Sequence, residues 1–284
     1  MRPRVHLMID SLVNAVTTAP WSPLRFGLAL TLDHKKLVPL RRKMLLVWGA
    51  VCIGGSAVVG GATGFGASLI AAPFMLLAGY NVPQVVVICL VTTGVSRFTA
   101  AFRLRDKIDW RRVMLLVLGS VPGAFAGALM LPLLPEQQLK RAVGVGVVLC
   151  GIGMASARLS RPYIPSVPTQ VFAGALSGFL STTTSLNGPP VALLLTRAAA
   201  RPLSFIADLA VYFTVTNALS LVILAGWGEV PTDVLWPTLP VLVTIAVIGN
   251  GLGHRIAQRL PAHTFRTAVL GLVILVGALT AVLA

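Results

Sequence analysis

The sequence predicts an all-α polytopic membrane protein made of two inverted repeats, each with a broken or re-entrant helical hairpin. Composition is the first reason. Of the 284 residues, 56% are hydrophobic and 11% are charged, whereas a soluble domain is about 25% charged because water must cover its surface. The apolar runs are the second reason, since they are long and do not alternate with polar residues, as in about eight spanning helices. The third reason is that the chain repeats itself.

The charge balance favours a membrane over a nucleic acid. The chain has 23 Lys and Arg against 8 Asp and Glu, a net charge of +15. The bases lie in short loops between apolar segments, as the positive-inside rule describes, and not on a soluble face with interleaved aromatic residues. We expect the lipid bilayer as a partner and no nucleic acid. We expect no cofactor or metal, because the cysteines lie inside apolar runs without metal-binding spacing, at Cys52, Cys89 and Cys150.

Residues 1–43 differ from the rest of the chain. They are basic, contain no run long enough to span a membrane, and lack the apolar core and cleavage site of a signal peptide. We interpret them as a basic extension that is surface-bound or partly disordered, or as the result of a start codon placed too early. From Met44 onward the apolar segments are 44–61, 63–79, 83–102, 113–134, 142–158, 169–186, 188–198, 204–225, 235–258 and 267–284.

Two junctions place glycine, proline and small hydroxyl residues inside apolar stretches. The first is Gly-Gly-Ala-Thr-Gly-Phe-Gly at 60–66, followed by Pro73. The second is Ser-Thr-Thr-Thr-Ser-Leu-Asn-Gly-Pro-Pro at 181–190. Such sequences break a helix. A break within the bilayer persists only where protein or a cavity surrounds the freed backbone groups, so we expect both breaks in the interior.

The internal repeat has two offsets. Near the breaks, Ser68 and Pro73 match Ser185 and Pro190 at an offset of 117. Further on the offset is 126, where Gly123, Gly127, Pro135, Leu139, Lys140 and Gly151 correspond to Gly249, Gly253, Pro261, Phe265, Arg266 and Gly277. The sequence therefore divides into a first membrane repeat, a Pro-rich cytoplasmic linker and a second membrane repeat, at 44–158, 159–168 and 169–284.

Loop charges indicate that the two repeats are inverted. The loop at 103–112 carries five bases against two acids, whereas its counterpart at 226–234 carries two acids and no base. By the positive-inside rule the first loop is cytoplasmic and the second external. Inverted repeats of this kind build many secondary transporters. The same parity places Met44 outside, in conflict with the bases at 41–43 that precede it.

The residues at the breaks resemble those of a known family. Gly60–Gly66 with Pro73 resembles the first half-signature of the sulfite exporter TauE/SafE family of membrane permeases. Asn187–Pro190 resembles the matching element of the second half. Ile108–Trp110 after a basic loop and Thr216-Asn217 inside a late helix also fit that pattern.

This resemblance covers about residues 44–284 and leaves out the N-terminal extension. It implies a multi-pass bacterial inner-membrane protein that moves small sulfur-containing anions such as sulfite or organosulfonates. The second hairpin departs from the pattern, because it is rich in Thr and Ser at 181–185 where the family has more glycine.

Arg97 is a candidate for binding an anion. It lies well inside the segment 83–102, where a charge costs roughly 2.5–3.5 kcal/mol on insertion scales. In one interpretation it is a cation that faces an anion path. In the other its side chain snorkels to the cytoplasmic surface, since Arg103 is only six residues further on, about 9 Å along a helix.

The helix ends at the two breaks are a second candidate. A helix that restarts after a break directs unpaired N–H groups and a positive dipole end into a cavity. The alternative is that the breaks serve folding only. The candidate substrate-binding residues there are Thr63, Gly64, Gly66, Ser68, Thr184, Ser185, Asn187 and Gly188. Asn217, which is polar in mid-helix, is either a further site residue or a hydrogen bond between helices.

Asp208 is the only acid inside an apolar segment. It is either a favourable first-turn acid of its helix or the candidate for proton coupling. No nucleophile–base set, paired carboxylates or metal motif is present, so we expect no enzyme.

The expected function is a secondary transporter or permease that exports a small anion. The family resemblance narrows that anion to sulfite, an organosulfonate or a related oxyanion. The alternatives are a permease or channel for a cation, metal or neutral solute, and a non-transporting membrane scaffold. The oligomeric state is left open.

Overall fold

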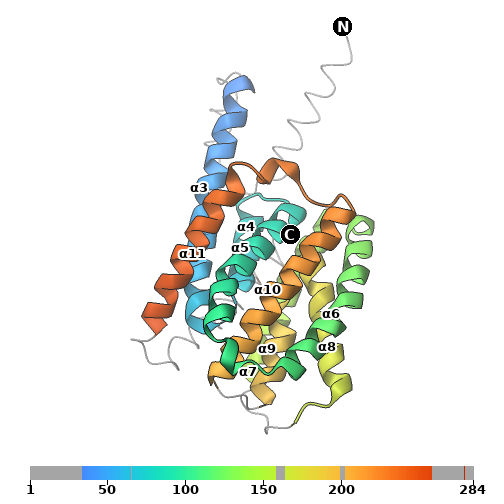
Figure 1. Ribbon diagram of the computed structural model, residues 1–284. Helices are drawn as coiled ribbons and strands as arrows, with labels where there is room; N and C mark the ends of the chain where they lie inside the picture. The colour runs from blue at the N-terminus through green and yellow to red at the C-terminus, as the bar shows by residue number, and fades with distance from the viewer. Residues whose placement is uncertain (1–33, 65, 158–163, 199–201, 258–277, 279–284) are drawn as a thin grey trace. The chain divides into compact units, whose positions relative to one another are not determined.

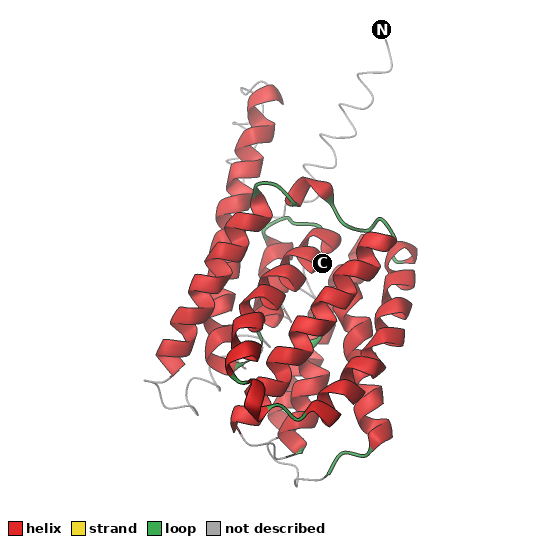
Figure 2. Cartoon of the chain, in the orientation of Figure 1, coloured by secondary structure: helices red, strands yellow, loops and turns green. Residues whose placement is uncertain are grey.

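The computed structural model describes residues 34–64, 66–157, 164–198, 202–257 and 278. Within these residues all regular structure is helical and no strand occurs (Figure 2), as the composition predicts. By internal contacts the chain divides into Met1–Met44 and Leu45–Ala284. The two breaks and the candidate site residues lie in the second unit.

The helices agree with the expected segments to within a few residues, except that the first begins ten residues before Met44. The expected last segment, 267–284, lies outside the described residues apart from residue 278. In chain order the helices are α3 (His34–Thr63), α4 (Ala67–Leu77), α5 (Val82–Arg103), α6 (Trp110–Met130), α7 (Glu136–Ala157), α8 (Val167–Thr184), α9 (Gly188–Arg197), α10 (Pro202–Gly226) and α11 (Thr238–Ala257).

Five of the described helices are long and apolar enough to cross a membrane, within α3, α5, α6, α10 and α11. Helices α4 and α9 have only 11 and 10 residues, about half a crossing. They are the short second arms of the two hairpins, and each begins directly after a break. The chain is therefore a multi-pass membrane protein with a broken hairpin in each half.

Local sequence explains where the helices around the first hairpin begin. Asn81 and Gln84 form a capping box at the start of α5, in which the Gln84 side chain accepts a hydrogen bond from the Asn81 N–H at 3.1 Å. Asp109 caps α6 by accepting from the Arg112 N–H at 3.2 Å. These caps fix the N-terminal ends of α5 and α6.

Two helix pairs are packed backbone to backbone by small residues. Helices α6 and α8 are in extensive contact. A methyl group built on Gly123 would collide there with the Ala175 carbonyl oxygen. Helix α11 meets α3 in the same way, because a methyl group on Gly253 would collide with the Val58 carbonyl oxygen. Close approach through glycine is typical of membrane helices.

These pairs follow the internal repeat. Gly123 faces Ala175 and Gly249 faces Gly54, so the two glycines on α6 and α11 are 126 positions apart and their partners on α8 and α3 are 121 apart. Helices α4 and α9 also begin 121 positions apart. The expected offset of 126 is confirmed for Gly123 and Gly127 with Gly249 and Gly253, whereas its further matches, at 261–277, lie outside the described residues. The offset of 117 near the breaks is wrong by about one helical turn. The prolines mislead because they occupy different turns of α4 and α9.

The loops at 103–112 and 226–234 lie at opposite ends of α10 (Figure 1). Near the start of α10 the Ser204 hydroxyl donates a hydrogen bond to the Lys107 carbonyl at 2.6 Å. The other loop leaves the far end of the same helix, whose 25 residues span about 38 Å. Equivalent loops of the two halves are therefore at opposite ends of the bundle, which confirms the inverted arrangement for this pair.

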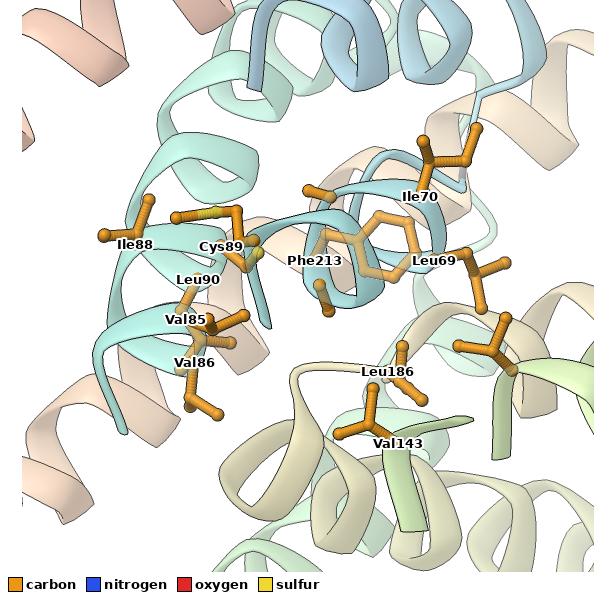
Figure 3. Packing of buried hydrophobic residues seen from close by; sticks show 14 of the residues in the cluster. Leu69, Ile70, Val85, Val86, Ile88, Cys89, Leu90, Val143, Leu186 and Phe213 are labelled. Carbon is orange, nitrogen blue, oxygen red and sulfur yellow. The ribbon is translucent and has the colours of Figure 1, made fainter. Parts of the chain in front are cut away.

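An apolar core surrounds the second arm of the first hairpin (Figure 3). It joins α4, α5, α7, α10 and the second break, through Leu69, Ile70, Val85, Cys89, Val143, Leu186 and Phe213. Large apolar side chains are also exposed on the outer faces of the helices, as expected where lipid replaces water, among them Phe98, Phe102, Leu118 and Val222.

Candidate anion site

The first break is made by two glycines in the left-handed region. Helix α3 ends at Thr63, and Gly64 and Gly66 follow with φ of 83° and 93°. Only glycine adopts such angles without steric cost. The chain turns there and restarts as α4, so the N-terminus of α4 lies inside the protein, with Gly66 and Ser68 both buried.

The second break uses serine where the first uses glycine. Ser185 ends α8 with φ of 59°, the only non-glycine residue of the described part with a positive φ. A left-handed serine is uncommon and carries some strain. Its hydroxyl lies beside the Cys89 thiol and has no partner at normal hydrogen-bond geometry. Helix α9 then begins at Gly188, which is buried.

Arg97 is buried, with 4% of its surface exposed. Its Nη2 donates a hydrogen bond to the Gly60 carbonyl oxygen at 2.6 Å, in the last turns of α3. Its Nε has no partner, and within the described part of the chain no acidic side chain pairs with it. The snorkelling alternative is therefore wrong, because the side chain turns inward towards the first break and keeps a free donor there.

A small cavity lies beside this guanidinium. Its volume is about 20 Å³, room for about one water molecule. Ala67, Ser68 and Ala71 line it from the first turns of α4, where backbone N–H groups have no partner within the helix. A buried cation and the positive end of a helix thus share one cavity. The complete polar lining, besides Arg97 and Cys89, is Ser56, Ser68, Thr92, Thr93, Ser96 and Asn250.

A second polar cluster holds the second break against α5. The Asn187 amide donates to the Asn217 side-chain oxygen at 2.6 Å, and the Asn217 amide donates to the Leu90 carbonyl at 3.1 Å. The Ser177 hydroxyl donates to the Asn187 carbonyl. Both asparagines are buried. Asn217 therefore makes hydrogen bonds between helices, as one of its two interpretations expects.

The structure divides the predicted site residues into two groups. Arg97 and Ser68 line the cavity, whereas Asn187 and Asn217 belong to the second cluster. Gly64 and Gly66 precede α4 and are not lining residues. Ser185 connects the two, since Cys89 beside it lines the cavity. The remaining two hydroxyls bond to carbonyls of their own helices, Thr63 to Val59 at 2.9 Å and Thr184 to Leu180 at 3.0 Å.

Several lining residues were not predicted from the sequence. On α5 they follow a helical spacing that ends at Arg97, with Cys89 and Thr93 at intervals of four. That spacing is a usable signal once Arg97 is singled out. Ser56 on α3 and Asn250 on α11 carry no such signal, because only the packing of these helices brings them to the cavity.

Asp208 lies in a different place, at the basic loop. It is fully buried, and it accepts hydrogen bonds from the Asp109 N–H and from Arg112 Nη1, both at 2.8 Å. Helix α10 begins at Pro202, so Asp208 is in its second turn and the first-turn interpretation is wrong. Its carboxylate instead fixes the loop between α5 and α6 to α10.

Comparison with known proteins identifies relatives but no related solved structure. The family model described as sulfite exporter TauE/SafE matches residues 47–280. A Cupriavidus necator protein named a probable sulfite/organosulfonate exporter TauE is 27% identical over 76% of this chain and 86% of its own length. A Comamonas testosteroni protein named a probable inner membrane transporter protein TsaS is 26% identical over 62% of this chain and 76% of its own. No solved structure matches the chain significantly.

Proposed function

The chain belongs to the sulfite exporter TauE/SafE family, and on that premise we propose that it is a secondary transporter or permease that exports a small anion across the bacterial inner membrane. Sulfite, an organosulfonate or a related oxyanion is the proposed substrate, in keeping with the names of its relatives. It acts as a permease and not as an enzyme. No nucleotide-binding motif is present in the sequence, which favours a gradient or simple downhill flux as the driving force.

The observation that carries this proposal is the buried guanidinium of Arg97. A charge in this position is costly, and no acidic partner offsets it within the described residues. Arg97, whose Nε has no partner, lines a cavity that residues of the first turns of α4 also line. An oxyanion placed there receives charge-assisted hydrogen bonds from the guanidinium and stabilisation from the helix end. An anion thus supplies the counter-charge that the described residues do not provide.

The size of the cavity bears on how such a permease works. About 20 Å³ holds roughly one water molecule and is too small for a sulfur atom with three oxygens. The helices around it must separate for a substrate to bind. We expect α4 to be the helix that moves, because two glycines precede it. Glycine can change its backbone angles at little steric cost.

A flux panel in proteoliposomes tests the proposal. Purified protein is reconstituted and its flux of sulfite, organosulfonates, halides and monovalent cations is measured, with and without a proton gradient. We expect flux of oxyanions and none of cations. Flux of cations without anions would overturn the assignment, and the response to the proton gradient would report the energy coupling.

A further inference from the structure

The cavity at the first break contains one charge. Among the residues that line it, Arg97 is the only charged side chain, and the others are apolar, hydroxyl, thiol or amide groups. The hydroxyls of Thr92 and Ser96 donate to carbonyls of their own helix at 2.7 Å. The positive groups that face an anion are therefore one guanidinium and one helix N-terminus.

Among the described residues, the second half of the molecule has no cation at the position that matches Arg97. Gly94 and Asn217 face each other where α5 and α10 meet, and they are 123 positions apart. At the same interval, the residue equivalent to Arg97 is Ser220. At the interval of 121 found for α3 and α8, the residue equivalent to its partner Gly60 is Ser181. Those two serines are hydrogen-bonded to each other at 2.8 Å. A neutral hydroxyl pair thus replaces the bond between guanidinium and carbonyl.

A large buried side chain stands where the first half has Cys89. Cys89 lines the cavity, and its equivalent at the interval of 123 is Tyr212. This tyrosine is fully buried, and its hydroxyl lies beside Ser177 and Ser120. The equivalent of Gly66 at the interval of 121 is Asn187, whose side chain donates a hydrogen bond to Asn217. At the positions compared, the second half therefore has no counterpart of the Arg97 guanidinium or of the groups beside it.

One buried cation sets the charge of the anion that it can hold. The free energy needed to remove an ion from water rises with the square of its charge. Its attraction to a single cation rises only in direct proportion to that charge. A monoanion leaves the cavity neutral. A dianion leaves one negative charge in a medium that stabilises charge poorly.

We propose, building on the function proposed above, that the Arg97 cavity takes monoanions: sulfonates with a single negative charge, or singly protonated oxyanions, in preference to dianions of the same size. Methanesulfonate and sulfate are a matched pair for this question. Both are tetrahedral at sulfur, and they differ by a methyl group in place of one charged oxygen.

The experiment measures uptake of ³⁵S-methanesulfonate and ³⁵S-sulfate into proteoliposomes at one neutral pH. For the unaltered protein we expect methanesulfonate flux to exceed sulfate flux by at least about tenfold. Equal fluxes, or faster sulfate flux, would overturn the monoanion inference while leaving anion export intact. Flux of no anion at all, here and in the wider panel, would overturn the proposed function itself.

A second cation placed in the cavity gives an independent readout. Asn250 lines it from α11, and its side-chain amide donates a long hydrogen bond to the Ser96 carbonyl, at 3.4 Å. Asn250→Lys should shift the flux ratio towards sulfate by about tenfold. Gln138→Lys, at an exposed position of α7, adds the same charge away from the cavity and should leave the ratio unchanged. Equal shifts in both variants would contradict the inference, and the unaltered protein decides it if Asn250→Lys does not fold.

Discussion

Arg97 and the exposed Arg103 lie on the same helix, six residues apart, and differ only in what surrounds them. Arg97 donates to the Gly60 carbonyl inside the protein, whereas Arg103 is exposed at the end of α5. Arg97→Gln should lower oxyanion flux by at least about tenfold, since it removes the charge proposed to bind the substrate. Arg97→Lys should be intermediate, because lysine keeps the charge and loses the planar fork. Arg103→Gln is the control in the same flux assay, and similar losses at both positions would contradict the role of Arg97.

Asp208 presents a second residue-scale question, since a buried carboxylate is either a fixed connection or a proton carrier. Both of its oxygens are bonded, to Asp109 and Arg112. Asp208→Asn should remove about 1.5–3 kcal/mol of stability, the range for a hydrogen bond to a charged group. It should lower the unfolding temperature in detergent by several degrees. Asp106→Asn, on a side chain that is 85% exposed, should change it little.

A proton carrier at this position would give a different result. Asp208→Asn would then unfold at the temperature of the unaltered protein, and its anion flux would no longer respond to a proton gradient. Measuring the unfolding temperature and the gradient response on the same preparation separates the two roles.

At the scale of elements, the glycine contacts between helices decide how the two halves meet. A methyl group on Gly123 would collide with the backbone of α8, whereas one on Gly251 would meet nothing within 4 Å. Gly123→Ala should destabilise the protein by roughly 1–3 kcal/mol, the usual cost of overpacking. Gly251→Ala should be neutral or slightly stabilising, since alanine favours helices. Thermal unfolding of the two variants in detergent compares them directly, and equal unfolding temperatures would count against close packing of α6 on α8.

The same elements explain how far sequence alone can predict this site. Gly64 and Gly66 mark the first break, because glycine inside an apolar run signals a backbone that other residues do not adopt. Arg97 is visible as a charge inside such a run. Ser56 and Asn250 are not visible, because small polar residues in apolar helices usually bond to their own backbone and their part in a cavity depends on which faces meet. The predicted register between α4 and α9 is wrong for a related reason, since proline is tolerated at more than one turn of a membrane helix.

At the scale of the whole molecule, the inverted arrangement makes a prediction about sidedness. The loop that contains Asp106 is basic and the loop that contains Thr232 is acidic, and they leave opposite ends of α10. By the positive-inside rule the first is cytoplasmic and the second external. Asp106→Cys and Thr232→Cys, both at exposed positions, place one label on each loop once the three native cysteines have been replaced.

A membrane-impermeant maleimide applied to vesicles of known orientation reads this sidedness directly. Inside-out vesicles should label the cysteine at position 106 and leave the one at position 232 unmodified, and right-side-out vesicles should give the reverse. The cysteine-free parent is the control for background. Because α10 is about 38 Å long, no small rearrangement brings both loops to one surface. Labelling of both from the same side would therefore contradict the inverted repeat itself, and with it the relation between the two halves from which the single-cation cavity is inferred.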